Sequence, residues 1–126
     1  MLTHTILIVE DDLDLRRLFR TALALDGYSV VEAGDGLEAL HVLDTTTIHA
    51  VVLDLGLPLV PGYVVLQEVA ARAHTQRVPV VVVVTGLPGP HDDLQANCVL
   101  LKPVMPDALV ATVRRCIAAG SSAHER

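Results

Sequence analysis

Four apolar runs of this sequence each end at polar residues whose types suit ionic chemistry. The polar residues are, in chain order, Glu10 and Asp11, Asp54, Thr85, and Lys102. Lys102 is the only lysine in a chain that has nine lysine and arginine residues in total. Because lysine provides a compact point charge that arginine does not, its position directly after an apolar run indicates that a cation is needed there. These five residues therefore form one candidate site.

The three carboxylates predict a metal site. If Glu10, Asp11 and Asp54 share one crevice, they repel one another, and each binds protons more tightly unless a cation relieves the repulsion. Mg2+ fits this requirement best, because it takes a few carboxylates, keeps several waters and leaves positions open for phosphate oxygens.

The same site predicts phosphoryl transfer. Asp54 is a candidate nucleophile that would accept a phosphoryl group as an acyl phosphate. Lys102 would neutralise the phosphoryl oxygens, and the Thr85 hydroxyl would donate to one of them. No second catalytic base is evident, which favours a stoichiometric phosphoacceptor over an enzyme that turns over.

The apolar periodicity predicts alternating strands and helices. Runs rich in Val, Ile and Leu predict strands at residues 5–9, 28–33, 49–54, 79–84 and 98–101. Helices are expected between Asp12 and Gly27, at residues 36–44 and 63–73, and from Pro106 onward. The expected apolar positions of the first helix are Leu15, Leu18, Phe19, Ala22 and Leu23.

This alternation predicts an α/β fold, a doubly wound five-stranded parallel sheet with helices on both faces. In such a sheet the ligand crevice lies outside the carboxyl ends of the strands, where all five candidate residues fall.

Length and composition exclude several classes of protein. A chain of 126 residues that is 52% hydrophobic is the size of one globular domain. The formal net charge of −6 and the scattered arginines argue against direct nucleic-acid binding. The longest strongly apolar stretch, residues 78–84, is too short to span a membrane. No signal peptide is readable, so we expect a cytoplasmic location without membrane contact.

The two cysteines, Cys98 and Cys116, are expected to be small core residues. They are too few and too far apart in sequence for a zinc ligand set or a disulfide framework. A redox role for Cys98, which lies close to Lys102, is the alternative interpretation.

Four motifs resemble the receiver domain of two-component response regulators, and the resemblance covers essentially the whole chain. The motifs are ILIVEDD at residues 6–12, VVLDL at 51–55 with Pro58 and Gly62 downstream, VVVTG at 82–86, and LKP at 101–103. Each motif is weak alone, but the four in this order are specific. The resemblance implies the flavodoxin-like strand order 2-1-3-4-5.

The resemblance also implies a role for each candidate residue. Asp54 would be the phosphoacceptor, Lys102 the phosphate-binding cation and Thr85 the switch hydroxyl. The expected Mg2+ ligands are Glu10, Asp11, Asp54 and the backbone carbonyl of Gly56. The implied phosphate donor is a histidine kinase or a histidine phosphotransfer protein. The effector would act in trans or lie on a C-terminal domain absent from this chain.

Two departures from the family pattern lie between Thr85 and Lys102. The intervening segment is several residues shorter than usual, and it contains Pro88 and Pro90. An interior proline costs a helix roughly 3 kcal/mol, so the fourth helix is expected to be shortened or absent. The family also usually places Tyr or Phe three residues before the lysine, where this chain has Val99.

Two alternative functions and the domain limits remain as expectations. The departures favour a degenerate receiver, a binding module that contacts a protein without phosphorylation-driven switching. A small flavin or nucleotide binder is disfavoured, because no glycine loop follows the first strand and aromatics are few. The receiver domain is expected at residues 1–120, followed by a frayed polar tail at 121–126 that could open a linker.

Overall fold

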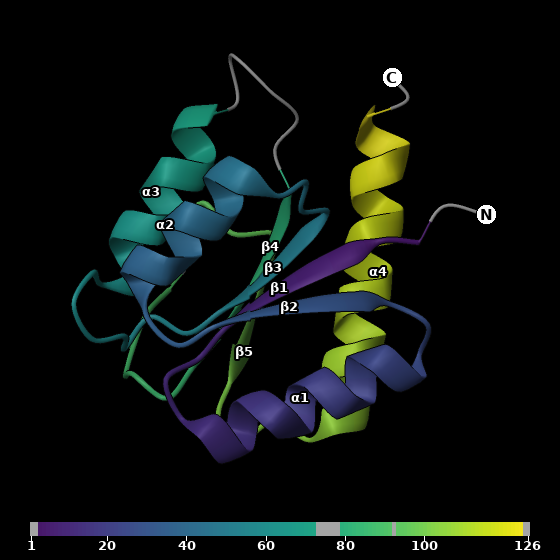
Figure 1. The fold of residues 1–126 in the computed structure, drawn as a ribbon, viewed down its shortest axis with the longest axis horizontal. Helices are drawn as coiled ribbons and strands as arrows, with labels where there is room; N and C mark the ends of the chain where they lie inside the picture. Colours follow the sequence, from purple (N-terminus) through teal and green to yellow (C-terminus); the bar gives the residue numbers. More distant parts are fainter. Residues whose placement is uncertain (1–2, 73–78, 92, 125–126) are drawn as a thin grey trace.

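The computed structural model describes residues 3–72, 79–91 and 93–124 (Figure 1). Its strands are β1 (Thr5–Val9), β2 (Ser29–Ala33), β3 (Ala50–Leu53), β4 (Val80–Thr85) and β5 (Cys98–Leu101). Its helices are α1 (Leu13–Leu25), α2 (Gly36–Thr45), α3 (Gly62–Ala71) and α4 (Pro106–His124). The strands form one parallel sheet in the order β2-β1-β3-β4-β5, which confirms the predicted fold class and strand order.

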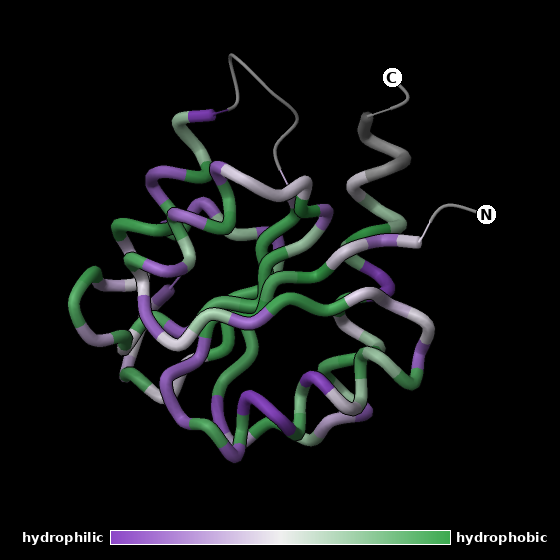
Figure 2. Tube along the Cα trace, in the orientation of Figure 1, coloured by the Kyte–Doolittle hydropathy of each residue, from purple (hydrophilic) through white to green (hydrophobic). Residues whose placement is uncertain are grey.

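Helices cover both faces of the sheet, α1 and α4 on one and α2 and α3 on the other (Figure 1). Successive residues of a strand point to opposite faces, so β1 divides its side chains between two cores. Ile6 and Ile8 pack with α1 and α4, whereas Leu7 and Val9 pack with α2 and α3. Figure 2 shows the resulting hydrophobic strands at the centre of the molecule. Burial on both faces explains why these strands are apolar runs.

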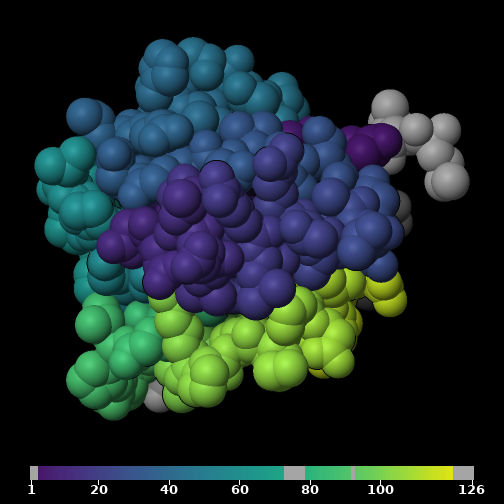
Figure 3. Space-filling model, turned by 60° about the horizontal axis from the view of Figure 1, so that its bottom comes forward, coloured from purple at the N-terminus to yellow at the C-terminus, as the bar shows by residue number. Residues whose placement is uncertain are grey.

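Helix α1 is capped by Asp12, whose side chain accepts the Leu15 N–H at 3.0 Å. Phe19 and Leu23 are buried, as expected. Leu18 is 48% exposed, so its expected place in the core is wrong. The neighbour of α1 on this face is α4, which lies beside it (Figure 3) and does not cover Leu18.

No helix lies between β4 and β5 in the described part of residues 86–97. The chain instead returns through turns and bends to Asn97, whose side-chain oxygen accepts the Val81 N–H at 2.7 Å. The Asn97 N–H in turn donates to the Val81 carbonyl at 2.9 Å. The described residues of this segment confirm the expectation that the fourth helix is shortened or absent. Val99 is 36% exposed on the strand that follows.

The C-terminal helix is longer than expected. Residues 121–124, expected to fray as a polar tail, continue α4 as far as His124. Residues 125–126 lie outside the described residues. Across 3–72, 79–91 and 93–124, no helix has the length and apolar character needed to cross a membrane.

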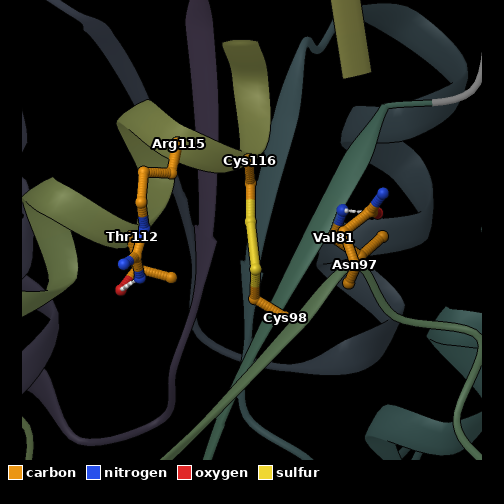
Figure 4. The surroundings of a disulfide bond; sticks show 6 residues. All are labelled: Val81, Asn97, Cys98, Thr112, Arg115 and Cys116. Carbon is orange, nitrogen blue, oxygen red and sulfur yellow. Dashed lines mark hydrogen bonds between the residues drawn. A yellow bond between two sulfur atoms is a disulfide. The ribbon is translucent and has the colours of Figure 1, made fainter. Parts of the chain in front are cut away.

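A disulfide bond joins Cys98 at the start of β5 to Cys116 on α4 (Figure 4). The expectation of two separate core cysteines is therefore wrong in part. Cys116 is buried as expected, but the packing of α4 against β5 brings its sulfur to that of Cys98. The bond fastens the last helix to the edge strand that leads to Lys102.

Reducing this disulfide is expected to lower the free energy of unfolding by about 3 kcal/mol, the loop-closure contribution for a loop of this length. The two cysteines are 18 residues apart in sequence. Urea unfolding with and without a thiol reductant measures the change. The double variant Cys98→Ser/Cys116→Ala is the control, because reductant should not alter its midpoint. Equal midpoints for the reduced and oxidised parent would contradict the prediction.

Candidate phosphoryl-transfer site

The five predicted residues lie together at the carboxyl edge of the sheet. Strand β1 ends beside β3, so Glu10 and Asp54 leave the sheet next to each other, and the Asp54 N–H donates to the Val9 carbonyl at 3.1 Å. Thr85 ends β4, and its carbonyl accepts the Lys102 N–H at 2.9 Å. Parallel pairing therefore gathers residues that are up to 92 positions apart in sequence.

Lys102 joins the two buried carboxylates of the site. Its ammonium nitrogen Nζ lies 2.7 Å from Glu10 Oε1 and 3.2 Å from Asp54 Oδ2. The Glu10 and Asp54 side chains are only 4% and 9% exposed, and that of Lys102 is 25% exposed. Buried carboxylates need charge partners, and one lysine here serves two of them.

The remaining oxygens of these carboxylates accept backbone N–H groups. Glu10 Oε2 accepts from Asp12 at 3.2 Å, and Asp54 Oδ1 accepts from Gly56 at 3.0 Å. Both carboxylates are therefore held in one orientation. The N–H of Gly56 thus contacts Asp54, whereas the carbonyl of Gly56 was the group expected to bind metal.

The pKa values of Glu10 and Lys102 reflect the presence of two buried carboxylates beside one ammonium group. Burial raises the pKa of Glu10, and the negative charge of Asp54 adds to the rise, although the hydrogen bonds from Lys102 and Asp12 oppose it. Burial would lower the pKa of Lys102, but its hydrogen bonds and ion pairs with Glu10 and Asp54 outweigh that effect and raise it. Lys102 is therefore a stable cation, and the site can accept more positive charge.

The carboxylates also form a group that suits a divalent cation. One oxygen from each of Glu10, Asp11 and Asp54 lies within 4.8 Å of the others. Asp11 is exposed, whereas the other two are buried, so the group opens to solvent on the Asp11 side. Three carboxylates with an open side fit a hard ion that keeps some of its waters.

Thr85 is fully buried, and its hydroxyl oxygen accepts the Leu87 N–H at 3.1 Å. The hydroxyl hydrogen can still donate, because one oxygen can accept and donate at once. The register of β3 and β4 pairs Leu53 with Val83, so Asp54 leaves the sheet close to the level of Thr85.

Gly62, a motif residue, lets α3 pack closely behind Asp54. A Cβ atom at Gly62 would collide with the backbone carbonyl of Asp54 and with Leu55. By contrast, a Cβ at Gly56 would meet only Asp54 Oδ1, at 3.8 Å, which is an ordinary contact. The absence of a side chain is therefore needed at Gly62 and not at Gly56.

A family model described as the response regulator receiver domain matches residues 6–114. The chain belongs to this family. The receiver domain is 33% identical over 123 residues to the probable transcriptional regulator ycf27 of Porphyridium aerugineum, covering 90% of this chain and 48% of that protein. It is 34% identical over 118 residues to the response regulator MprA of Mycobacterium sp. (strain KMS), covering 86% and 48%. The chain thus spans about half the length of the curated relatives it matches.

Solved structures of receiver domains share the fold. The CheY-like receiver domain protein of Methanospirillum hungatei JF-1 superposes with a TM-score of 0.86 at 22% identity, covering 96% of this chain and 98% of that one. The chemotaxis response regulator CheY4 of Vibrio cholerae gives 0.82 at 23% identity, covering 91% and 99%. At these identities the likeness concerns the fold alone. The family is one of signalling domains in two-component systems and not of classical enzymes.

Proposed function

We propose that this receiver domain accepts a phosphoryl group on Asp54 in a Mg2+-dependent reaction. The observation that carries the proposal is the contact of one lysine with both Glu10 and Asp54, beside the open carboxylate Asp11. This arrangement leaves a carboxylate nucleophile next to a fixed cation, at a site whose negative charge is only partly balanced.

In the proposed step, an Asp54 carboxylate oxygen attacks the phosphorus atom of a phosphohistidine. A new O–P bond forms, the N–P bond breaks, and the released imidazole takes up a proton. Lys102 stabilises the phosphoryl oxygens, and the Thr85 hydroxyl donates to one of them. The N–H of Gly56 holds Asp54 in its orientation through Oδ1.

Mg2+ fits the carboxylate group and, when bound, would neutralise charge on the phosphoryl oxygens. Glu10, Asp11, Asp54 and the Gly56 carbonyl are the proposed ligands. Glu10 and Asp54 already share Lys102, so Asp11 is the carboxylate most available to the ion.

Receiver domains interact with histidine kinases and with effectors, and we propose a histidine kinase or histidine phosphotransfer protein as the donor for this chain. The effector would act in trans or belong to a longer protein, of which residues 1–120 form the receiver domain. We also propose a cytoplasmic location. The Cys98–Cys116 bond argues against this location, because disulfides are rare in reducing compartments such as the cytoplasm.

The second candidate function is a degenerate receiver. No helix joins β4 to β5 in the described part of residues 86–97, and Val99 is exposed on β5. Both features favour this candidate, because they alter the surface through which the site would act on a partner. A degenerate receiver would keep the fold and act as a protein-binding module without phosphorylation-driven switching.

Incubation with acetyl phosphate separates the two candidates. The parent protein is expected to gain one phosphoryl group when Mg2+ is present and none when the metal is chelated by EDTA. Intact mass spectrometry measures the gain, and addition of hydroxylamine should remove it, because an acyl phosphate is cleaved by this nucleophile. No gain in Mg2+ would favour the degenerate receiver, and equal gain in EDTA would contradict the metal dependence.

A further inference from the structure

Arg16 connects α1 to the loop that carries the acidic residues. Its guanidinium Nη1 donates to the backbone carbonyl of Glu10 at 2.9 Å, and its Nε donates to Glu32 Oε1 at 3.1 Å. The side chain is only 18% exposed. One planar cation thus joins the end of β1 to the end of β2.

The contact with Glu10 acts on a particular peptide bond. The carbonyl of Glu10 belongs to the peptide group that links it to Asp11, so its orientation sets the direction of the Asp11 side chain. On the other side of Asp11, Asp12 is fixed as the helix cap and donates its N–H to Glu10 Oε2. Asp11 itself is exposed. Its position therefore depends on these two neighbouring anchors.

The fold makes room for this guanidinium. A Cβ atom at Gly34 would lie 3.1 Å from Arg16 Nη1, which is closer than nearly all such contacts. Glu32, from the strand before Gly34, holds the same guanidinium by charge and is 27% exposed. Such planar, two-point donation is specific to arginine.

We infer that Arg16 is a positioning residue for the metal site: it orients the Glu10–Asp11 peptide group so that the Asp11 carboxylate faces Glu10 and Asp54. The inference rests on the proposed function, because it concerns the same Mg2+ site. Groups that hold metal ligands in place typically change metal affinity 10–100-fold when they are removed.

The sign of the effect distinguishes this role from simple electrostatics. A cation near the site repels Mg2+, so removal of the Arg16 charge alone would tighten Mg2+ binding. Loss of the anchor would instead weaken it. Arg16→Gln is expected to raise the Mg2+ dissociation constant about 10-fold. Titration of the metal-free protein with MgCl2, followed by calorimetry, measures this constant without any phosphoryl donor.

Arg20→Gln is the matched control. Arg20 also pairs with Glu32, at 3.4 Å, and is one helical turn from Arg16, but this contact does not involve Glu10. The Mg2+ dissociation constant of Arg20→Gln should stay within about 2-fold of the parent value, because only an exposed ion pair is lost. Arg16→Lys keeps the positive charge and can still form an ion pair with Glu32. This variant therefore tests the inference even if Arg16→Gln fails to fold. It should lose about as much affinity as Arg16→Gln, because an ammonium group lacks the two-point donation.

Unchanged or tighter Mg2+ binding by Arg16→Gln and Arg16→Lys, with normal binding by the parent, would overturn the inference and leave the proposed function intact. Absence of Mg2+ binding by the parent would overturn both. A 10-fold loss in both Arg16 variants, with parent-like Arg20→Gln, supports the positioning role.

Discussion

Replacing Asp54 with asparagine is expected to abolish phosphoryl uptake from acetyl phosphate and Mg2+. Asparagine keeps the shape and the oxygen that accepts the Gly56 N–H, but its amide is not a nucleophile for phosphorus. The fold should survive, because Lys102 keeps its ion pair with Glu10 and neither of these two charges is left unpaired. Intact mass spectrometry after incubation measures uptake, and urea unfolding confirms that the variant is folded.

The matched control for this change is Asp14→Asn. Asp14 lies in the exposed first turn of α1, three residues beyond Asp11, and its removal costs the chain the same charge. This variant should take up one phosphoryl group, as the parent does. Uptake by Asp54→Asn at the parent's level would show that another residue is the phosphoacceptor.

Replacing Lys102 with methionine is expected to lower the free energy of unfolding by about 3 kcal/mol at neutral pH, because removal of one partner leaves buried carboxylates uncompensated. Glu10 and Asp54 both lose the ammonium group with which they form ion pairs. The rate of phosphoryl uptake should fall by about 100-fold, since a fixed positive group no longer faces the phosphoryl oxygens. Urea unfolding and the time course of intact mass measure the two effects.

The stability loss in Lys102→Met should depend on pH in a defined direction. Burial already raises the pKa of Glu10 above its ordinary value of 4.5, and loss of the Lys102 hydrogen bond raises it further. A carboxyl group with a raised pKa binds more protons when folded than when unfolded. Stability therefore falls as the pH rises from 4.5 through the raised value. The deficit should be larger at pH 8 than at pH 5.

Arg114→Met is the control for this charge removal. Arg114 is 63% exposed and forms an ion pair with Asp26 at the end of α1, and its ion pair involves neither Glu10 nor Asp54. Its loss should cost less than about 1 kcal/mol, as exposed ion pairs do. An equal loss of unfolding free energy in Lys102→Met at pH 5 and at pH 8 would contradict its assignment to the raised pKa of Glu10.

The sheet and the site residues were predictable from the sequence because they depend on local signals. Runs such as residues 80–84 must be buried on both faces, and parallel pairing places their carboxyl ends at one edge. Lys102 stood out as the single lysine at such an end. The prolines after Thr85 likewise predicted a shortened or absent helix before β5, where the described residues contain none, because proline is incompatible with a helix interior.

Other features were not predictable because they depend on how separate elements pack. Leu18 fits the apolar period of α1, but only the placement of α4 determines that it stays exposed. The partner of Cys98 depends on the position of α4 relative to β5, which two cysteines in a sequence do not reveal. The Arg16 side chain donates to the backbone carbonyl of Glu10. Because every residue has such a carbonyl, the sequence does not indicate which one the arginine contacts.

Asp54 itself is expected to carry the phosphoryl group. Reduction with borohydride after incubation with acetyl phosphate and Mg2+ converts an aspartyl phosphate into homoserine, which peptide mass spectrometry locates in the sequence. We expect homoserine at position 54 and unchanged aspartate at position 11. Homoserine at another position, or unmodified Asp54 in a protein that binds Mg2+, would contradict it.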